Sequence, residues 1–165
     1  MGVPAHPGPL LQLLPLPAAV LVVLLNLLFR IGISKRVRLV LRPGVDDADS
    51  IFNFLERQGS AWGARREVIY RAISATNELF EAVGSAGLAE GDIDLEVSFD
   101  EFNLDVVARY RGEPPVLPSR RPDVVDLLGE GPSASLAAFM VTRYANSVRV
   151  DTRDGACRVR LHFDH

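Results

Sequence analysis

The chain has 165 residues, of which 48% are hydrophobic, and it carries 21 acidic against 18 basic residues. Its single cysteine, Cys157, excludes a disulfide framework and a thiolate metal cluster within one chain, and it suits a reducing, cytoplasmic compartment. The acidic balance argues against a nucleic-acid partner, which needs a basic surface to neutralise phosphates.

Charge is distributed unevenly along the chain. Residues 1–29 contain no Lys, Arg, Asp or Glu, and every charged residue within 30–42 is basic. These basic side chains belong to Arg30, Lys35, Arg36, Arg38 and Arg42. All 21 acidic residues follow, so the sequence divides into an apolar block, a basic segment and an acidic domain.

The apolar block contains a stretch, Leu10 to Phe29, whose length matches the hydrocarbon core of a bilayer at ~1.5 Å per helical residue. A signal peptide carries its positive charge before such a stretch, whereas here the charge follows. We therefore predict a transmembrane helix over residues 10–30, rather than a signal peptide or a buried core helix, with the following domain in the cytoplasm. Residues 1–9, rich in Pro and Gly, are predicted to form a loop.

The sequence LPLPAAVLVVLLNLLFRIGISKR resembles the final transmembrane helix of the xanthine/uracil nucleobase permeases, which often end in a proline-led apolar run closing on an LLNLLFR-like sequence. The resemblance implies the C-terminal part of a transporter in the inner or plasma membrane, with the bilayer and the rest of the permease as partners. One helix forms no transport pathway, so this chain alone binds no nucleobase for transport. Residues 31–43 are predicted to be a basic juxtamembrane segment that runs into the first strand and lies against anionic headgroups.

Residues 36–165 are predicted to form one cytoplasmic domain, because polar and apolar residues alternate at strand and helix periods throughout it. The first predicted elements are a strand from Arg36 to Pro43, a helix capped by Asp46 or Asp47 and ended by Gly63, and a second helix over 64–83. Strands over 93–99 and 103–110 follow, and then a Pro/Arg-rich loop and the short apolar piece VVDLL. The domain closes with a helix over 133–146 and a hairpin across RDGA. This order predicts an α/β (α+β) two-layer sandwich: a mixed, mainly antiparallel sheet with helices on one face.

The order of elements resembles the ATP-binding domain shared by histidine kinases, DNA gyrase and the anti-sigma-factor serine kinases, and it matches the last of these best in size. The resemblance implies a histidine-kinase-like ATPase fold over residues 36–165 and Mg-ATP as the cofactor. The first family motif is Glu, three residues, then Asn, on a helix; Asn77 stands here at the Glu position and Glu81 at the Asn position. Glu81 is thus the candidate metal ligand, whereas the amide of Asn77 cannot act as a general base. The alternative is that both residues form a solvated helix flank.

The second family motif is an Asp that accepts the adenine amino group, followed by Gly-x-Gly. Here Tyr110 stands for the Asp, Gly112 is retained, and Pro114 replaces the second glycine. A phenol accepts a hydrogen bond but intrudes where the purine lies, and the alternative for Tyr110 is an edge-strand aromatic. Proline also removes a backbone donor.

The third family motif is a Gly-x-Gly that opens a helix, where phosphates approach backbone N–H groups. The matching residues are Ser133 and Ser135, and Gly129 and Gly131 lie just upstream. The alternative is an ordinary helix with Ser133 as its N-cap after a flexible loop.

The sequence therefore predicts a non-catalytic regulatory or nucleotide-sensing domain, tethered to the membrane as part of a nucleobase transporter. A first alternative is a membrane-tethered anti-sigma-type serine kinase that binds ATP. A second is a membrane-anchored module that binds a protein partner and no ligand. No catalytic residue is assigned, and a nucleic-acid partner is not expected.

Overall fold

The computed structural model describes residues 19–25, 34–118, 120 and 132–165. The chain divides into two compact units, Met1–Ile33 and Ser34–His165. In the first unit residues 19–25 are helical, and the rest of the predicted transmembrane segment over 10–30 lies outside the described residues. Among the residues that are described, no helix is both long and apolar enough to cross a bilayer.

The second unit has the order of elements that the sequence predicts. They are β1 (Lys35–Leu41), α2 (Ala48–Trp62), α3 (Arg66–Ser85), β2 (Ile93–Phe99), β3 (Asn103–Arg111), α4 (Pro132–Tyr144), β4 (Ser147–Arg153) and β5 (Ala156–Asp164). The predicted helix over 133–146 starts one residue earlier and ends two residues earlier, so Ser133 lies within its first turn and is not its N-cap. Proline suits that first turn. The predicted piece VVDLL lies outside the described residues.

The strands form one five-stranded sheet in the order β1-β2-β3-β5-β4, and every neighbouring pair is antiparallel. The prediction of a mixed sheet is wrong for these strands. β3 and β4, which flank α4 in the sequence, run parallel to one another, but β5 turns back and lies between them. The hairpin turn has positive φ at Asp154 and Gly155, as a two-residue turn of the I′ type requires.

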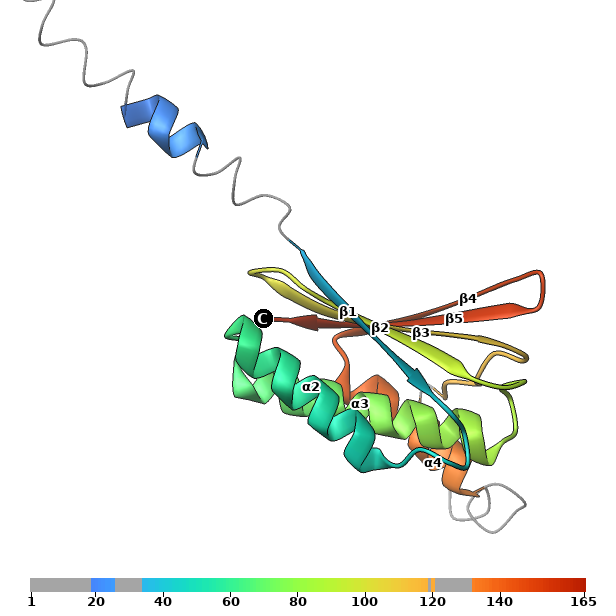
Figure 1. Ribbon diagram of the computed structural model, residues 1–165. Helices are drawn as coiled ribbons and strands as arrows, with labels where there is room; N and C mark the ends of the chain where they lie inside the picture. Colours follow the sequence, from blue (N-terminus) through green and yellow to red (C-terminus); the bar gives the residue numbers. More distant parts are fainter. Residues whose placement is uncertain (1–18, 26–33, 119, 121–131) are drawn as a thin grey trace, which may run out of the picture. The chain divides into compact units, whose positions relative to one another are not determined.

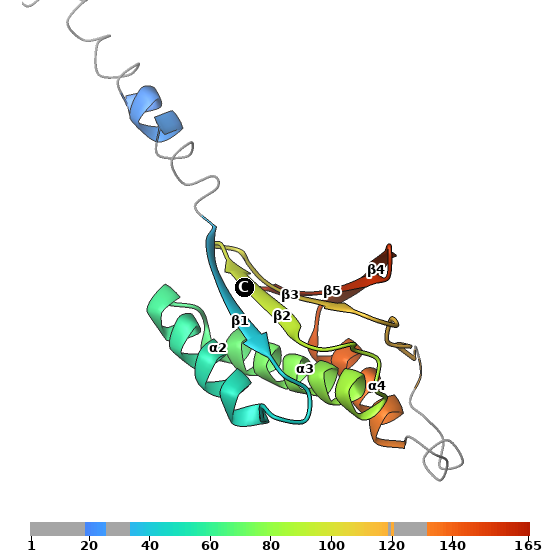
Figure 2. The same ribbon diagram turned by 45° about the vertical axis from the view of Figure 1, so that its right-hand side comes forward.

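Helices α2, α3 and α4 cover one face of the sheet, and the other face carries no helix among the described residues of this unit (Figures 1 and 2). Strand β2 alternates buried and half-buried side chains, and β5 buries every second side chain from Cys157 to Phe163. These buried side chains pack on α2, α3 and α4 to form a continuous core. Ser34–His165 therefore has a hydrophobic core of its own.

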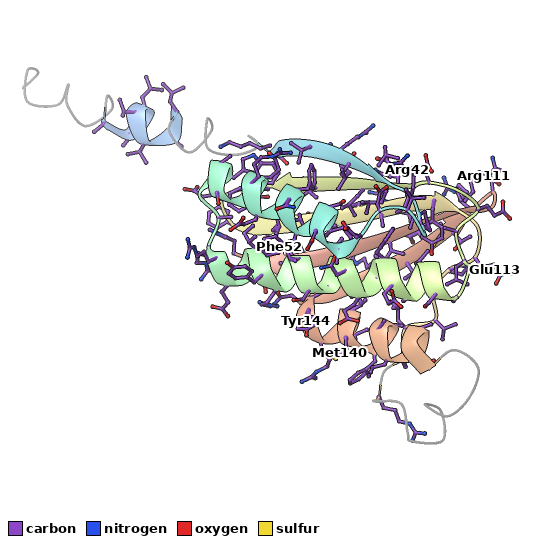
Figure 3. All side chains as sticks on the ribbon, turned by 60° about the horizontal axis from the view of Figure 1, so that its bottom comes forward. Arg42, Phe52, Arg111, Glu113, Met140 and Tyr144 are labelled. Atoms are coloured by element: carbon purple, nitrogen blue, oxygen red, sulfur yellow. The ribbon has the colours of Figure 1, made fainter. Side chains whose placement is uncertain are left out.

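Helix α3 lies between α2 and α4 (Figure 3). Asp47 is the N-cap of α2, and its side chain accepts a hydrogen bond from the backbone N–H of Ser50. Gly63, with φ of 72°, is the C-cap. Gly59 of α2 lies directly against the side chain of Ile69 in α3. The missing side chain at residue 59 lets these two helices approach closely.

Candidate functional site

The two flanks of α3 contact different neighbours. On one flank Tyr70 stacks on Phe52 of α2, with ring centroids 6.5 Å apart. On the other flank the guanidinium Nε of Arg71 donates to the carbonyl oxygen of Tyr144 in α4 at 3.0 Å, and Ala82 packs against Ala138. Residues three, four and seven apart share a helix face, so these contacts assign every later residue of α3 to a flank.

The predicted pair Asn77 and Glu81 lies on the flank that faces α2. Asn77 is seven residues after Tyr70, and Glu81 is eleven residues after it. The two side chains thus share a face. The Oδ1 atom of Asn77 is buried and has no hydrogen-bond partner among the described residues. Neither of them lies on the flank that faces α4.

Glu78 lies on the flank that faces α4, seven residues after Arg71 and four before Ala82. Burial raises the pKa of its carboxyl group, and the nearby charge of Glu81 adds to this shift. The sequence interpretation missed Glu78 because it aligned the motif on Asn77. Moving the motif by one residue places an acid at its first position and Ala82 at its second. The contacts of α3 with α2 and α4 show which flank each residue lies on, and they are the reason for moving the motif to Glu78.

A groove lies where the C-terminal end of α3, residues 113–116 and the N-terminal end of α4 meet. We call it the α3–α4 groove; its volume is about 570 Å³, and its wall includes Ala82, Ser85, Pro114, Val116, Ser135 and Ala138. Ser135 is the predicted site residue that lines it. Gly129 and Gly131 lie outside the described residues, as does the side chain of Ser133. Among the described residues, Glu113 is the only charged one on its wall, and Figure 3 shows it beside the end of α3.

Tyr110 is buried in the core, with 5% of its surface exposed, on the central strand β3. Its interpretation as an edge-strand aromatic is therefore wrong. The hydroxyl donates to the carbonyl oxygen of Glu113 at 3.0 Å. Burial raises the pKa of the phenol strongly, and the neighbouring Cys157 adds to the shift.

The side chain of Tyr110 occupies the place where the family motif predicts the adenine acceptor. The cavity that remains beside it, between Thr76, Leu79 and Ala108, has a volume of about 10 Å³. A cavity of this size holds at most a single water molecule. A purine ring therefore does not fit between α3 and the sheet at this position.

Gly112 has a structural reason to be glycine. Its φ is +132°, its backbone pairs with Ala89, and a Cβ atom at this position would collide with the carbonyl group of Leu88. The next N–H, of Glu113, donates to the carbonyl oxygen of Leu88 at 3.0 Å. These bonds hold residues 113–116 over the end of α3, and they account for the retained glycine without a nucleotide.

The described residues contain no group of three or more His, Cys, Asp or Glu side chains that could hold a metal ion. Glu81, the predicted metal ligand, therefore belongs to no such group in the part of the chain that the structure describes.

No family model matches this chain, and no curated protein matches it. Solved structures with a similar fold include the RsbU and RsbW domains of Rv1364c from Mycobacterium tuberculosis, with a TM-score of 0.56 and 16% identity over 78% of this chain. This chain spans 32% of that structure, about a third of its length. The SiaB-SiaC complex from Pseudomonas aeruginosa has a TM-score of 0.47 and 12% identity, covering 89% of this chain and 98% of that one.

The likeness to the structure that contains the RsbU and RsbW domains supports the predicted two-layer fold, in which helices cover one face of a sheet. The permease context and the transmembrane tether receive no support from these comparisons. They stay predictions from residues 10–36.

Proposed function

We propose that Ser34–His165 is a regulatory domain of the anti-sigma-factor kinase type that acts by binding a protein partner, without transferring phosphate from ATP. The likeness of fold to the structure with the RsbW domain supports the regulatory type. The observation that supports the rest is the buried side chain of Tyr110, which stands at the position of the family's adenine-binding Asp and leaves a cavity of only about 10 Å³ beside it.

The α3–α4 groove is the proposed binding surface for the partner. Small uncharged side chains such as Ala82, Ser135 and Ala138 line it, and Val116 at its rim is 84% exposed. Such a wall suits an apolar segment of a partner protein better than a triphosphate, which needs cationic groups around it. Glu113 at the rim favours a basic residue on that segment.

Titrating Mg-ATP into residues 34–165 tests the proposal that this domain no longer binds a nucleotide. In calorimetry with millimolar Mg-ATP or Mg-ADP we expect no saturable heat, and with labelled ATP we expect no phosphate on any serine of a co-purified protein. Saturable binding, or phosphate transfer by the native chain, contradicts the proposal.

Site-specific crosslinking tests the groove. A photoreactive residue at Ser135 should form an adduct with one protein partner in cells, whereas the same residue at the exposed Glu56 of α2 serves as the matched control. Equal labelling from both positions would show that the groove is not the binding surface. No adduct from either position would favour a domain that works without this groove.

A working ATP-dependent serine kinase is the second candidate, and one observation favours it. Glu78 supplies an acid of raised pKa on the flank of α3 that faces α4, whereas Asn77 supplies none. If the native chain does transfer phosphate, Glu78→Gln should abolish the transfer and Glu81→Gln should preserve it. If Glu81→Gln abolished phosphate transfer and Glu78→Gln did not, the motif would align on Asn77 and Glu81 and not on Glu78.

A further inference from the structure

The helix-free face of the sheet is basic, although the chain as a whole is acidic. In antiparallel strands, paired residues lie on one face, so the pairing assigns each side chain to a face. Eight arginines from β1, β3, β4 and β5 lie on the helix-free face. They stand against five acids: Asp94, Glu96, Asp105, Asp151 and Asp164. Among the other described side chains of Ser34–His165, acids outnumber bases.

Three of the eight arginines form ion pairs with acids of the same face. Arg38 and Arg109 both bind the carboxylate of Glu96, at 3.0 and 3.3 Å. Arg160 binds Asp105 at 2.7 Å. These ion pairs occupy the centre of the sheet.

The five remaining arginines form no ion pair with any residue that the structure describes. They are Arg36 on β1, Arg111 on β3, Arg149 and Arg153 on β4, and Arg158 on β5. All five are exposed, and together they extend from one edge strand to the other. Exposed arginines that form no ion pair attract a broad anionic surface.

The few apolar side chains of this face help to decide whether its anionic partner is a nucleic acid, a protein or a lipid surface. Its apolar side chains in the described strands are Val40, Val107 and Ala156, and the aromatic ring on it in these strands is the imidazole of His162, which contacts Asp105. A single imidazole, already in contact with a carboxylate, offers no series of rings on which successive unpaired bases stack. A protein interface would bury aromatic or large apolar anchors at its centre, whereas the centre here carries ion pairs.

We infer that the helix-free face is a docking surface for anionic lipid headgroups. Strand β1, which contributes Arg36 and Arg38 to it, follows in sequence the apolar stretch from Leu10 to Phe29. Arginines near an anionic leaflet add binding energy one by one, without specific pockets. Docking through this face leaves α2, α3 and α4 free on the opposite side of the sheet (Figure 1). The α3–α4 groove lies among these helices and stays open as well.

Vesicle co-sedimentation of residues 34–165 tests this inference, since this unit has a core of its own. We expect binding to phosphatidylcholine vesicles that contain about a third phosphatidylglycerol, no binding to pure phosphatidylcholine, and release when the salt concentration is raised. Arg149→Gln combined with Arg153→Gln should lower the partition coefficient about tenfold or more, because each arginine acts independently on the surface charge.

The matched control is Arg57→Gln combined with Arg66→Gln, which removes two exposed arginines of α2 and α3 and changes the net charge equally. It should leave vesicle binding unchanged, and both double variants should melt as the native unit does. An equal loss in both double variants would overturn the inference, because net charge alone would then account for binding. So would absent binding to anionic vesicles, equal binding to neutral ones, or tighter binding to single-stranded nucleic acid or an acidic polypeptide at the same salt concentration.

Discussion

The close approach of Gly112 to the backbone of Leu88 leaves no room for a side chain at residue 112. Gly112→Ala combines a φ of +132° with a collision between the new Cβ and the carbonyl group of Leu88. We expect it to lower the free energy of unfolding by about 2 kcal/mol or more, as strained φ and overpacking each cost about 1–3 kcal/mol. Gly84→Ala in α3 is the control, because a Cβ there meets no atom within 4 Å. It should stabilise the helix by roughly 1 kcal/mol in the same urea titration. Equal effects of the two changes would contradict the close approach.

The hydroxyl of Tyr110 stabilises the position of residues 113–116. Tyr110→Phe removes its hydrogen bond to the carbonyl oxygen of Glu113 and should destabilise the domain by about 1 kcal/mol. Tyr70→Phe, at a ring that is 45% exposed, should change the stability far less. Proteolysis at residues 113–118 should quicken in the first variant only. Unchanged protection there would show that the backbone bonds around Gly112 hold this segment without the tyrosine.

Helix α3 shows what a sequence pattern settles and what it leaves open. The apolar stripe through Ile69, Ile73 and Val83 predicts correctly which side of α3 is buried. A stripe has two flanks, however, and the sequence does not say which one faces α4. That choice depends on contacts such as Arg71 with Tyr144, which join residues 73 positions apart. The sequence therefore aligns the motif by its spacing alone, at Asn77 and Glu81, and misses Glu78.

The crossing of α2 and α3 depends on the absence of a side chain at residue 59. A Cβ at Gly59 would overlap the side chain of Ile69, which is 5% exposed and has little room to move. We expect Gly59→Ala to destabilise the domain by about 1–3 kcal/mol, despite the better helix propensity of alanine. Ile69→Val removes part of the overlapping atoms, so the double variant should lose less stability than the sum of the two single changes. Additive losses in denaturant titrations would show that the two residues do not compete for space.

At the scale of the whole molecule, the local elements were predictable and their order in the sheet was not. Strict alternation of side chains predicts β2 and β3 closely, and the turn at Asp154–Gly155 predicts the last hairpin. Alternation specifies the face of each residue but not the neighbour of each strand. Nothing local indicates that β5 enters between β3 and β4. The α3–α4 groove depends on that order too, since it places α4 beside α3.

The ion pairs across the helix-free face make the stability of the whole unit depend on pH. Hydrogen bonds from Arg109, opposed by burial and aided by Arg38, hold the pKa of Glu96 below its usual value of 4.5. Burial raises the pKa of Asp105, but its bonds to Arg160 and His162 outweigh burial, and the net shift from 3.8 is downward. A folded-state pKa below the unfolded one means stability that is present above the unfolded pKa and lost as the pH falls through the folded pKa.

We therefore expect the free energy of unfolding to fall as the pH drops below about 4.5 in urea titrations. The raised pKa of Glu78 acts in the opposite sense, since that group takes up its proton more readily in the folded state, and it offsets part of the loss. Asp105→Asn should reduce the loss between neutral pH and about pH 3, because Arg160 then has no carboxylate to release. Glu56→Gln, an exposed acid of α2, should keep the full loss. If both variants lose stability in parallel with the native unit, the ion pairs of the sheet face do not govern its acid unfolding.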